Sequence, residues 1–346
     1  MIQRTATRIE ARQSDHDTRS WQQLLSDSVT TPEDLLRRLE LDPALWLSGA
    51  TEGHRLFPLR VPEPYLQRIV PGDPADPLLR QVLPLSAETD TRSGFVRDPL
   101  QESDSMQATG LIRKYQSRAL LMVTGQCAIN CRYCFRRHFP YDEHRLSPED
   151  RAEVLTTLGN DTRVNEVIFS GGDPLVANDR LLSSWAESLA GISHIRRLRI
   201  HTRLPVVIPQ RVCESLLGWI SESRLQVVMV IHTNHPAELD NHTRHALERL
   251  KAAGVTLLNQ SVILKGVNDT AEVLTDLSER LFECGVLPYY LHAFDPVEGA
   301  HHFSVSDDKA RALVRQLIGA LPGFLVPKLV RELPDRPGKT PLDLFA

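Results

Sequence analysis

The sequence of 346 residues lacks three features that would place it in a familiar class. No apolar run approaches the roughly 20 residues needed to span a bilayer, so we expect no membrane segment. Basic residues are not in excess, because the formal net charge is −4, and this argues against a broad nucleic-acid-binding face. The five cysteines are odd in number, which does not favour a disulfide framework. Since the chain also starts with polar residues rather than an apolar signal core, we expect a cytoplasmic protein.

The first third of the chain has little regular patterning. Short helices are predicted near Trp21–Ser26 and Pro32–Leu41, the second because Thr31 is a suitable N-cap and Pro32 suits the first helical position. From Pro58 to Pro99 the chain is rich in proline and glycine, which indicates an irregular segment wrapped over another part of the molecule. We therefore predict that residues 1–108 form an N-terminal helical and proline-rich extension.

From about residue 119, short apolar runs alternate with amphipathic windows. The runs are Ala119–Thr124, Glu166–Ser170, Arg197–Thr202, Gln226–His232, Thr256–Ser261 and Val286–His292. The helical windows lie near 148–158, 178–190, 209–221, 238–253 and 270–284, with a later helix near Ser306–Leu317 and a strand-like run at Phe324–Val330. Parallel strands need such crossovers and are covered on both faces. The pattern predicts an α/β fold, a partial six-unit barrel over residues 109–330, followed by a short tail at 331–346.

Most of these runs end in polar or glycine-bearing clusters, for example Ser170-Gly171-Gly172-Asp173 after the second run and His232-Thr233-Asn234-His235 after the fourth. In barrel enzymes the chemistry lies at the carboxyl ends of the strands. We therefore expect the functional site at this end of the barrel.

Three cysteines, Cys127, Cys131 and Cys134, follow the first run at a spacing of Cys-x-x-x-Cys-x-x-Cys. Structural zinc takes four ligands, usually as two cysteine pairs, and neither Cys213 nor Cys284 belongs to a second pair. Three thiolates can instead hold three irons of a [4Fe–4S] cluster and leave the fourth iron open to a ligand. A zinc site completed by a histidine, or three unrelated cysteines, is the alternative.

With Tyr133 before its last cysteine, this motif resembles the signature of radical S-adenosylmethionine (SAM) enzymes. The flanking sequence is similar to the lysine 2,3-aminomutase family within that class. The segments that carry the resemblance begin at Lys114-Tyr115, Leu121, Cys131-Arg132-Tyr133-Cys134, Ser170-Gly171-Gly172-Asp173-Pro174, Arg203, His232 and Gly266-Val267-Asn268-Asp269. The resemblance covers roughly residues 110–342. It implies a partial (β/α)6 radical SAM barrel and an isomerase that moves an amino group along L-lysine.

In this family the open iron binds the amino and carboxylate groups of SAM, whose cleavage gives a carbon radical. The glycines of Ser170, Gly171, Gly172 and Asp173 allow a backbone to come close to a ligand. The resemblance implies that this segment meets the amino group of SAM. It also implies further SAM contacts from His232 and Gln260.

The family also uses pyridoxal 5′-phosphate (PLP), which needs a lysine for a Schiff base. The candidates in this sequence are Lys114, Lys251, Lys265, Lys309, Lys328 and Lys339. The resemblance assigns the Schiff base to Lys339, although a single glycine precedes it where the family's free-lysine enzymes have several. Lys114, in place of a family arginine, resembles with Tyr115 and Arg118 the groups that cradle the PLP ring and phosphate.

For the substrate, the resemblance assigns Arg136 to the lysine carboxylate, a role that suits the two-pronged guanidinium. It assigns Asp295 and Asp335 to the distal ammonium. Two aspartates favour lysine over glutamate, because they would repel a distal carboxylate.

The short sequence after Lys339 and the proline-rich N-terminal segment resemble the bacterial branch that makes (R)-β-lysine for modifying elongation factor P. That branch implies a functional link to elongation factor P and its lysyl ligase, and an electron donor that the sequence does not identify. Three alternatives stay open: a catabolic lysine or glutamate 2,3-aminomutase, a radical enzyme without PLP, and a non-catalytic iron–sulfur electron carrier or sensor.

Overall fold

A computed structural model describes residues 19–141, 146–334, 336 and 338–345. One sheet of ten strands runs through it, and the strands follow one another in space in the order of the sequence. Neighbours from β3 to β9 are parallel. These strands are β3 (Arg118–Thr124), β4 (Glu166–Gly171), β5 (Arg197–Thr202), β6 (Gln226–His232), β7 (Thr256–Val262), β8 (Leu287–His292) and β9 (Lys328–Arg331).

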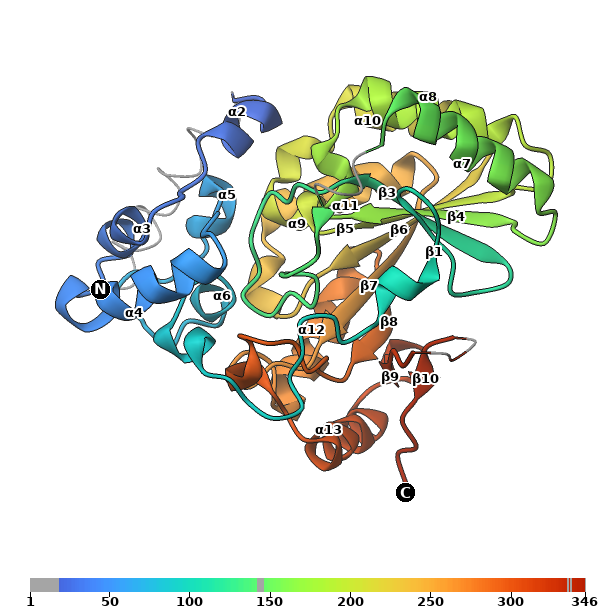
Figure 1. Ribbon diagram of the computed structural model, residues 1–346. Coiled ribbons are helices and arrows are strands. Elements are labelled where there is room, and N and C mark those ends of the chain that lie inside the picture. Colours follow the sequence, from blue (N-terminus) through green and yellow to red (C-terminus); the bar gives the residue numbers. More distant parts are fainter. Residues whose placement is uncertain (1–18, 142–145, 335, 337, 346) are drawn as a thin grey trace.

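A crossover helix follows each strand from β3 to β8, as a parallel sheet requires. These helices are α7 (Pro148–Asn160), α8 (Asp179–Ala190), α10 (Glu214–Glu222), α11 (Asn241–Ala252), α12 (Ala271–Glu283) and α13 (Asp307–Ala320). Figure 1 shows α7, α8 and α10 along one outer side of the sheet. The six units confirm the predicted α/β fold with a partial barrel.

Antiparallel strands extend the sheet at both edges. At one edge are β1 (Met106–Ala108) and β2 (Leu111–Ile112), and at the other is β10 (Thr340–Pro341), which pairs with β9. The pairing of β10 places Lys339 one residue before the last strand of the sheet. The late strand begins later than predicted, since Gly323–Leu325 forms a 3-10 turn and β9 starts only at Lys328.

The N-terminal extension forms a group of helices beside the barrel (Figure 1). They are α2 (Trp21–Ser26), α3 (Pro32–Arg38), α4 (Pro43–Leu56), α5 (Glu63–Leu66) and α6 (Pro77–Arg80), with 3-10 turns η1 (Ser86–Thr89) and η2 (Glu102–Ser105). The sequence analysis did not predict α4. The segment from Pro58 to Pro99 is largely irregular, as expected, apart from α5, α6 and η1, which have four residues each.

The extension and the barrel share one hydrophobic core. Leu35, Tyr65 and Leu79 of the extension are fully buried in the same cluster as Phe169 and Leu198 of the sheet. Burying these apolar side chains together stabilises the packing of the extension against the barrel. In the described residues no helix is both long and apolar enough to cross a bilayer.

Candidate active site

A cavity of about 290 Å³ opens at the carboxyl ends of the parallel strands. Every site residue predicted from the sequence lines it except Asp335, which lies outside the described residues. The predicted residues that the structure brings together are Lys114, Tyr115, Arg118, Cys127, Cys131, Cys134, Arg136, Ser170, Gly171, Gly172, Asp173, His232, Gln260, Asp295 and Lys339.

The cysteine loop follows β3 directly. Burial raises the pKa of the Cys134 thiol to about 11, and the nearby Cys131 adds to this rise. Burial and the nearby Cys134 likewise raise the pKa of Cys127. Neighbouring thiols therefore add to the effect of burial in disfavouring ionisation of Cys127 and Cys134, and a bound cation would offset it.

In the part of the chain that the structure describes, no three or more His, Cys, Asp or Glu side chains converge as ligands of one metal ion. The Cys-x-x-x-Cys-x-x-Cys spacing is what indicates an iron–sulfur cluster with one open iron.

The turn after β4 packs tightly against the cysteine loop. A Cβ added at Gly171 would lie 2.3 Å from Thr124 O, and one at Gly172 would lie 2.4 Å from Gln126 O. Gly172 N donates to Thr124 O and Asp173 N donates to Gln126 O, both at 2.8 Å. The two glycines are thus required by the close approach of two loops, and these two amides are already paired within the protein.

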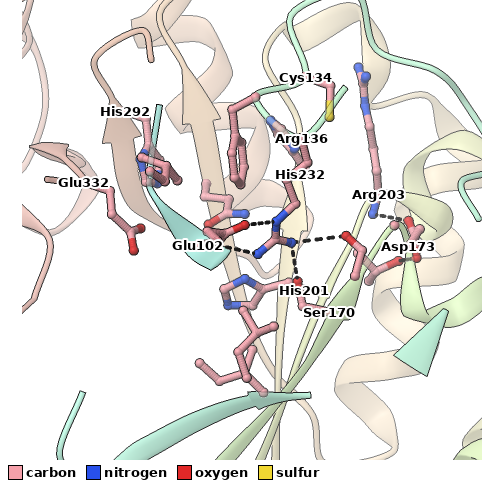
Figure 2. Close-up of a pocket in the computed structure, with 18 of the residues that line it drawn as sticks. Glu102, Cys134, Arg136, Ser170, Asp173, His201, Arg203, His232, His292 and Glu332 are labelled. Atoms are coloured by element: carbon pink, nitrogen blue, oxygen red, sulfur yellow. Dashed lines mark hydrogen bonds and ion pairs between the residues drawn. The ribbon is translucent and has the colours of Figure 1, made fainter. Parts of the chain in front are cut away.

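Asp173 also has partners within the protein. Its buried carboxylate accepts a hydrogen bond from Thr202 Oγ1 at 2.6 Å. It accepts another from Arg203 N at 2.7 Å (Figure 2). These bonds fix the end of β5 beside the cysteine loop. The structure therefore gives Asp173 a positioning role.

Five charged side chains form a line of alternating sign along the cavity. Arg136 donates to Glu102 through Nε at 2.6 Å and Nη2 at 2.9 Å, and its Nη1 donates to Ser170 Oγ at 3.0 Å (Figure 2). Lys114 Nζ lies 3.5 Å from Glu102 Oε1 and 3.6 Å from Glu332 Oε1. Lys339 Nζ donates to Glu332 Oε2 at 2.6 Å. The line joins the residue expected to hold the substrate carboxylate to the lysine expected to hold PLP.

Lys339 and its neighbours fit PLP. Arg118 stacks over the Tyr115 ring at 3.9 Å from its centroid, and the Tyr115 hydroxyl donates to Glu332 Oε1 at 2.9 Å. A second cavity, of about 750 Å³, adjoins this corner. Its lining includes the basic residues Arg113, Lys114, Arg118 and Arg336. A phosphate suits such a set of cationic donors.

Asp295 and Glu332 are the acidic side chains at the Lys339 end of the cavity. Burial raises the pKa of Asp295 to about 7, although Lys339 acts in the opposite direction. Burial alone would raise the pKa of Glu332 as well, but the ammonium groups of Lys339 and Lys114 hold it well below its usual range. One site carboxylate thus titrates near neutral pH while the other stays ionised.

Three histidines of the cavity are neutral. Burial lowers the pKa of His232 to about 3, and it places the pKa values of His201 and His292 well below the usual range. Nε2 of His232 and of His201 is buried without a protein partner. A neutral imidazole beside a cavity can donate to or accept from a ligand.

The sequence analysis identified neither Glu102 nor Glu332 as a site residue. His201 and His292 belong to the polar strand-end clusters where the site was expected, but they were assigned no role. His201, His292 and Glu332 carried a usable signal, because they lie at or just after the ends of β5, β8 and β9, where polar residues were expected to gather. Glu102 carried no such signal, since it comes from an irregular segment.

Comparisons with known proteins agree with this architecture. The radical SAM superfamily matches residues 121–277. An L-lysine 2,3-aminomutase of Escherichia coli (strain K12) is 49% identical over 94% of this chain and 94% of its own length. One of Haemophilus influenzae is 46% identical over 94% of this chain and 96% of its own length. One of Clostridium subterminale is 32% identical over 95% of this chain and 79% of its own length.

Proposed function

The chain belongs to the L-lysine 2,3-aminomutase family of radical SAM enzymes, and on that premise we propose that it converts L-α-lysine into (R)-β-lysine with PLP as a second cofactor. The observation that carries the proposal is one cavity lined by the three cysteines at one end and by Lys339 with two acidic side chains at the other. An electron carrier or sensor has no need for the second end.

Cys127, Cys131 and Cys134 would hold the iron–sulfur cluster. When bound, the cluster and SAM supply a carbon radical that can remove hydrogen from an unactivated carbon. The turn from Ser170 to Asp173 braces the cysteine loop through its backbone amides. His232 and Gln260, at the ends of β6 and β7, lie where they could bind the rest of SAM.

Lys339 would anchor PLP, with Tyr115 and Arg118 against the ring and the basic side chains of the adjoining cavity on the phosphate. When bound, PLP supplies a conjugated electron acceptor beside the amino nitrogen, which lets that nitrogen move to the neighbouring carbon. Lys339 must first lose a proton, and Glu332 is the side chain that holds its ammonium.

The two charged ends of the substrate would each bind side chains of the opposite charge. Arg136 suits the lysine carboxylate, and its guanidinium is held between Glu102 and Ser170. Asp295 and Glu332 suit the distal ammonium. Glu332 is added because it lies in contact with Lys339. The role expected of Asp335 stays a prediction, since Asp335 lies outside the described residues.

We further propose that the product serves the modification of elongation factor P, through a separate lysyl ligase. The identity of 49% with the Escherichia coli relative, against 32% with that of Clostridium subterminale, supports grouping this chain with the former. An electron donor of low potential must also meet the cluster.

The test is anaerobic reconstitution with iron, sulfide and PLP, followed by incubation with SAM, a reductant and one amino acid at a time. We expect L-lysine to yield 3,6-diaminohexanoate of R configuration, identified by nuclear magnetic resonance and chiral chromatography. Glutamate should stay unchanged. Product of S configuration would contradict the assignment to the elongation factor P branch, and turnover of glutamate but not lysine would contradict the substrate.

A further inference from the structure

Arg203, the residue after β5, is a buried arginine that touches a cysteine of the cluster loop. Its Nη1 donates to Cys131 Sγ at 2.7 Å, and the residue is 5% exposed. Its backbone N donates to Asp173, so the same residue also braces the turn after β4 (Figure 2). Arg203 thus joins the cysteine loop to the ends of β4 and β5.

The orientation of the Arg203 guanidinium is fixed from several sides. Its carbon lies 5.4 Å from the centroid of the Tyr65 ring and 5.7 Å from that of the Tyr133 ring. Its Nη2 donates to Glu238 Oε2 at 2.8 Å and to Gln81 Oε1 at 2.7 Å. With its other nitrogen on Cys131, the guanidinium has little freedom to turn away.

Part of this support comes from the N-terminal extension. Tyr65 lies in α5 and Gln81 directly follows α6, while Glu238 belongs to the barrel turn η6 (Pro236–Glu238). Arg68 of the extension also donates to Glu238 O at 2.5 Å and to Val206 O at 2.6 Å. The extension therefore holds both Arg203 and the barrel loops around it.

We propose that Arg203 is a positioning residue for the cluster, which raises its reduction potential by donating to Cys131 Sγ. One-electron reduction of a [4Fe–4S] cluster by an external low-potential donor adds a negative charge that spreads onto the sulfur ligands. A hydrogen-bond donor and a positive charge at Cys131 stabilise this reduced state more than the oxidised one. Because the site is buried, water screens the interaction little.

The same argument gives Glu238 the opposite effect. Its carboxylate is fully buried and paired with Arg203, so it offsets part of the positive charge near Cys131. Neutralising Glu238 should make reduction easier, whereas removing Arg203 should make it harder. A purely structural role for these residues predicts no such opposition of sign.

The experiment is a redox titration of the reconstituted full-length protein followed by electron paramagnetic resonance, without lysine or PLP. The titration depends on the cluster alone. A negative result would therefore leave the proposed conversion of lysine untouched, and failure of that conversion would leave the titration valid. Arg203→Met should lower the reduction equilibrium constant at least tenfold, which is about 59 mV for one electron. Arg203→Lys keeps the charge without the rigid fork and should shift it less. Glu238→Gln should shift it in the opposite direction.

Arg211→Met is the matched control. Arg211 is equally buried and is paired with Asp179, but the sulfur nearest to it is that of Cys213, outside the cluster loop. We expect the cluster of the Arg211→Met variant to have the same reduction potential as that of the wild type. If Arg203→Met assembles no cluster, Arg203→Lys and Glu238→Gln decide the matter. Unchanged potentials in both, or shifts of the same sign, would overturn the proposal.

Discussion

Lys339 Nζ lies 2.6 Å from Glu332 Oε2, a contact that joins the residue before β10 to the residue after β9. Both side chains are largely shielded, with 17% and 16% of their surface exposed. The ammonium groups of Lys339 and Lys114 hold the pKa of Glu332 well below its usual range, so this carboxylate stays ionised. If Lys339 holds PLP as proposed, the same carboxylate would be free to take the ammonium of the substrate.

The proposed pairing of Glu332 with the substrate ammonium can be tested by removing its charge. In Glu332→Gln, PLP should still bind, but the KM for lysine should rise by about 10- to 100-fold, because the side chain keeps an acceptor oxygen and loses the negative charge that pairs with the substrate ammonium. The measurement is steady-state kinetics combined with the absorbance of bound PLP. An unchanged KM would show that the substrate ammonium lies elsewhere.

Asp295 should give lysine binding a dependence on pH. Its carboxyl is protonated below its pKa of about 7 and then cannot attract a cation. The KM for lysine should therefore rise as the pH falls from 8 to 6, by up to about tenfold per pH unit below the pKa. Asp295→Asn should raise the KM at pH 8 and remove the pH dependence between 6 and 8. A pH profile shared by the variant and the wild type would rule out Asp295 as its source.

Alanine variants of the three cluster cysteines should differ in iron content from an alanine variant of Cys213. Replacing Cys127, Cys131 or Cys134 by alanine removes a cluster ligand, so the reconstituted variant should lose most of its iron and the visible iron–sulfur absorbance. Cys213→Ala, which changes a cysteine near Asp179, should keep both. Retention of a full cluster in any of the first three variants would contradict the ligand assignment.

The glycine turn should prove essential to the cysteine loop. In Gly172→Ala the new Cβ would lie 2.4 Å from a backbone oxygen, so we expect a loss of about 1–3 kcal/mol in the free energy of unfolding and weaker cluster binding. Gly218→Ala, within α10 and with no atom near the added Cβ, should be neutral or stabilising by up to about 1 kcal/mol. Chemical denaturation of the two variants provides the comparison.

The barrel was largely predictable because short apolar or alternating runs are separated by amphipathic helical windows. β5 and β6 have the predicted bounds, Arg197–Thr202 and Gln226–His232. Helix α4 was not predicted, although Asp42 and Pro43 carry a helix-start signal. Its two glycines, Gly49 and Gly53, lower its intrinsic helix propensity. The structure supplies the reason for Gly53: a Cβ there would lie 2.7 Å from Leu85 N, so close packing against η1 requires a glycine.

Site residues that directly follow a barrel strand could be predicted from the sequence, whereas site residues in irregular segments outside the barrel could not. Glu102 meets Arg136 from an irregular turn 34 residues earlier in the chain, and neither periodicity nor spacing marks it. Glu332 directly follows β9, so its position at a strand end was a signal in the sequence, although it was not predicted as a site residue. Burial decides the pKa of Asp295, and the sequence alone does not give burial.

The central claim is that Lys339 carries PLP in the cavity that the three cysteines also line. Borohydride reduction of the reconstituted enzyme, followed by digestion and peptide mass spectrometry, tests it most directly. We predict a stable PLP adduct on Lys339 in the wild type, retained in Lys309→Ala, whose ammonium pairs with Asp269 at the surface, and absent in Lys339→Ala. An adduct on another lysine, or none despite added PLP, would contradict the account.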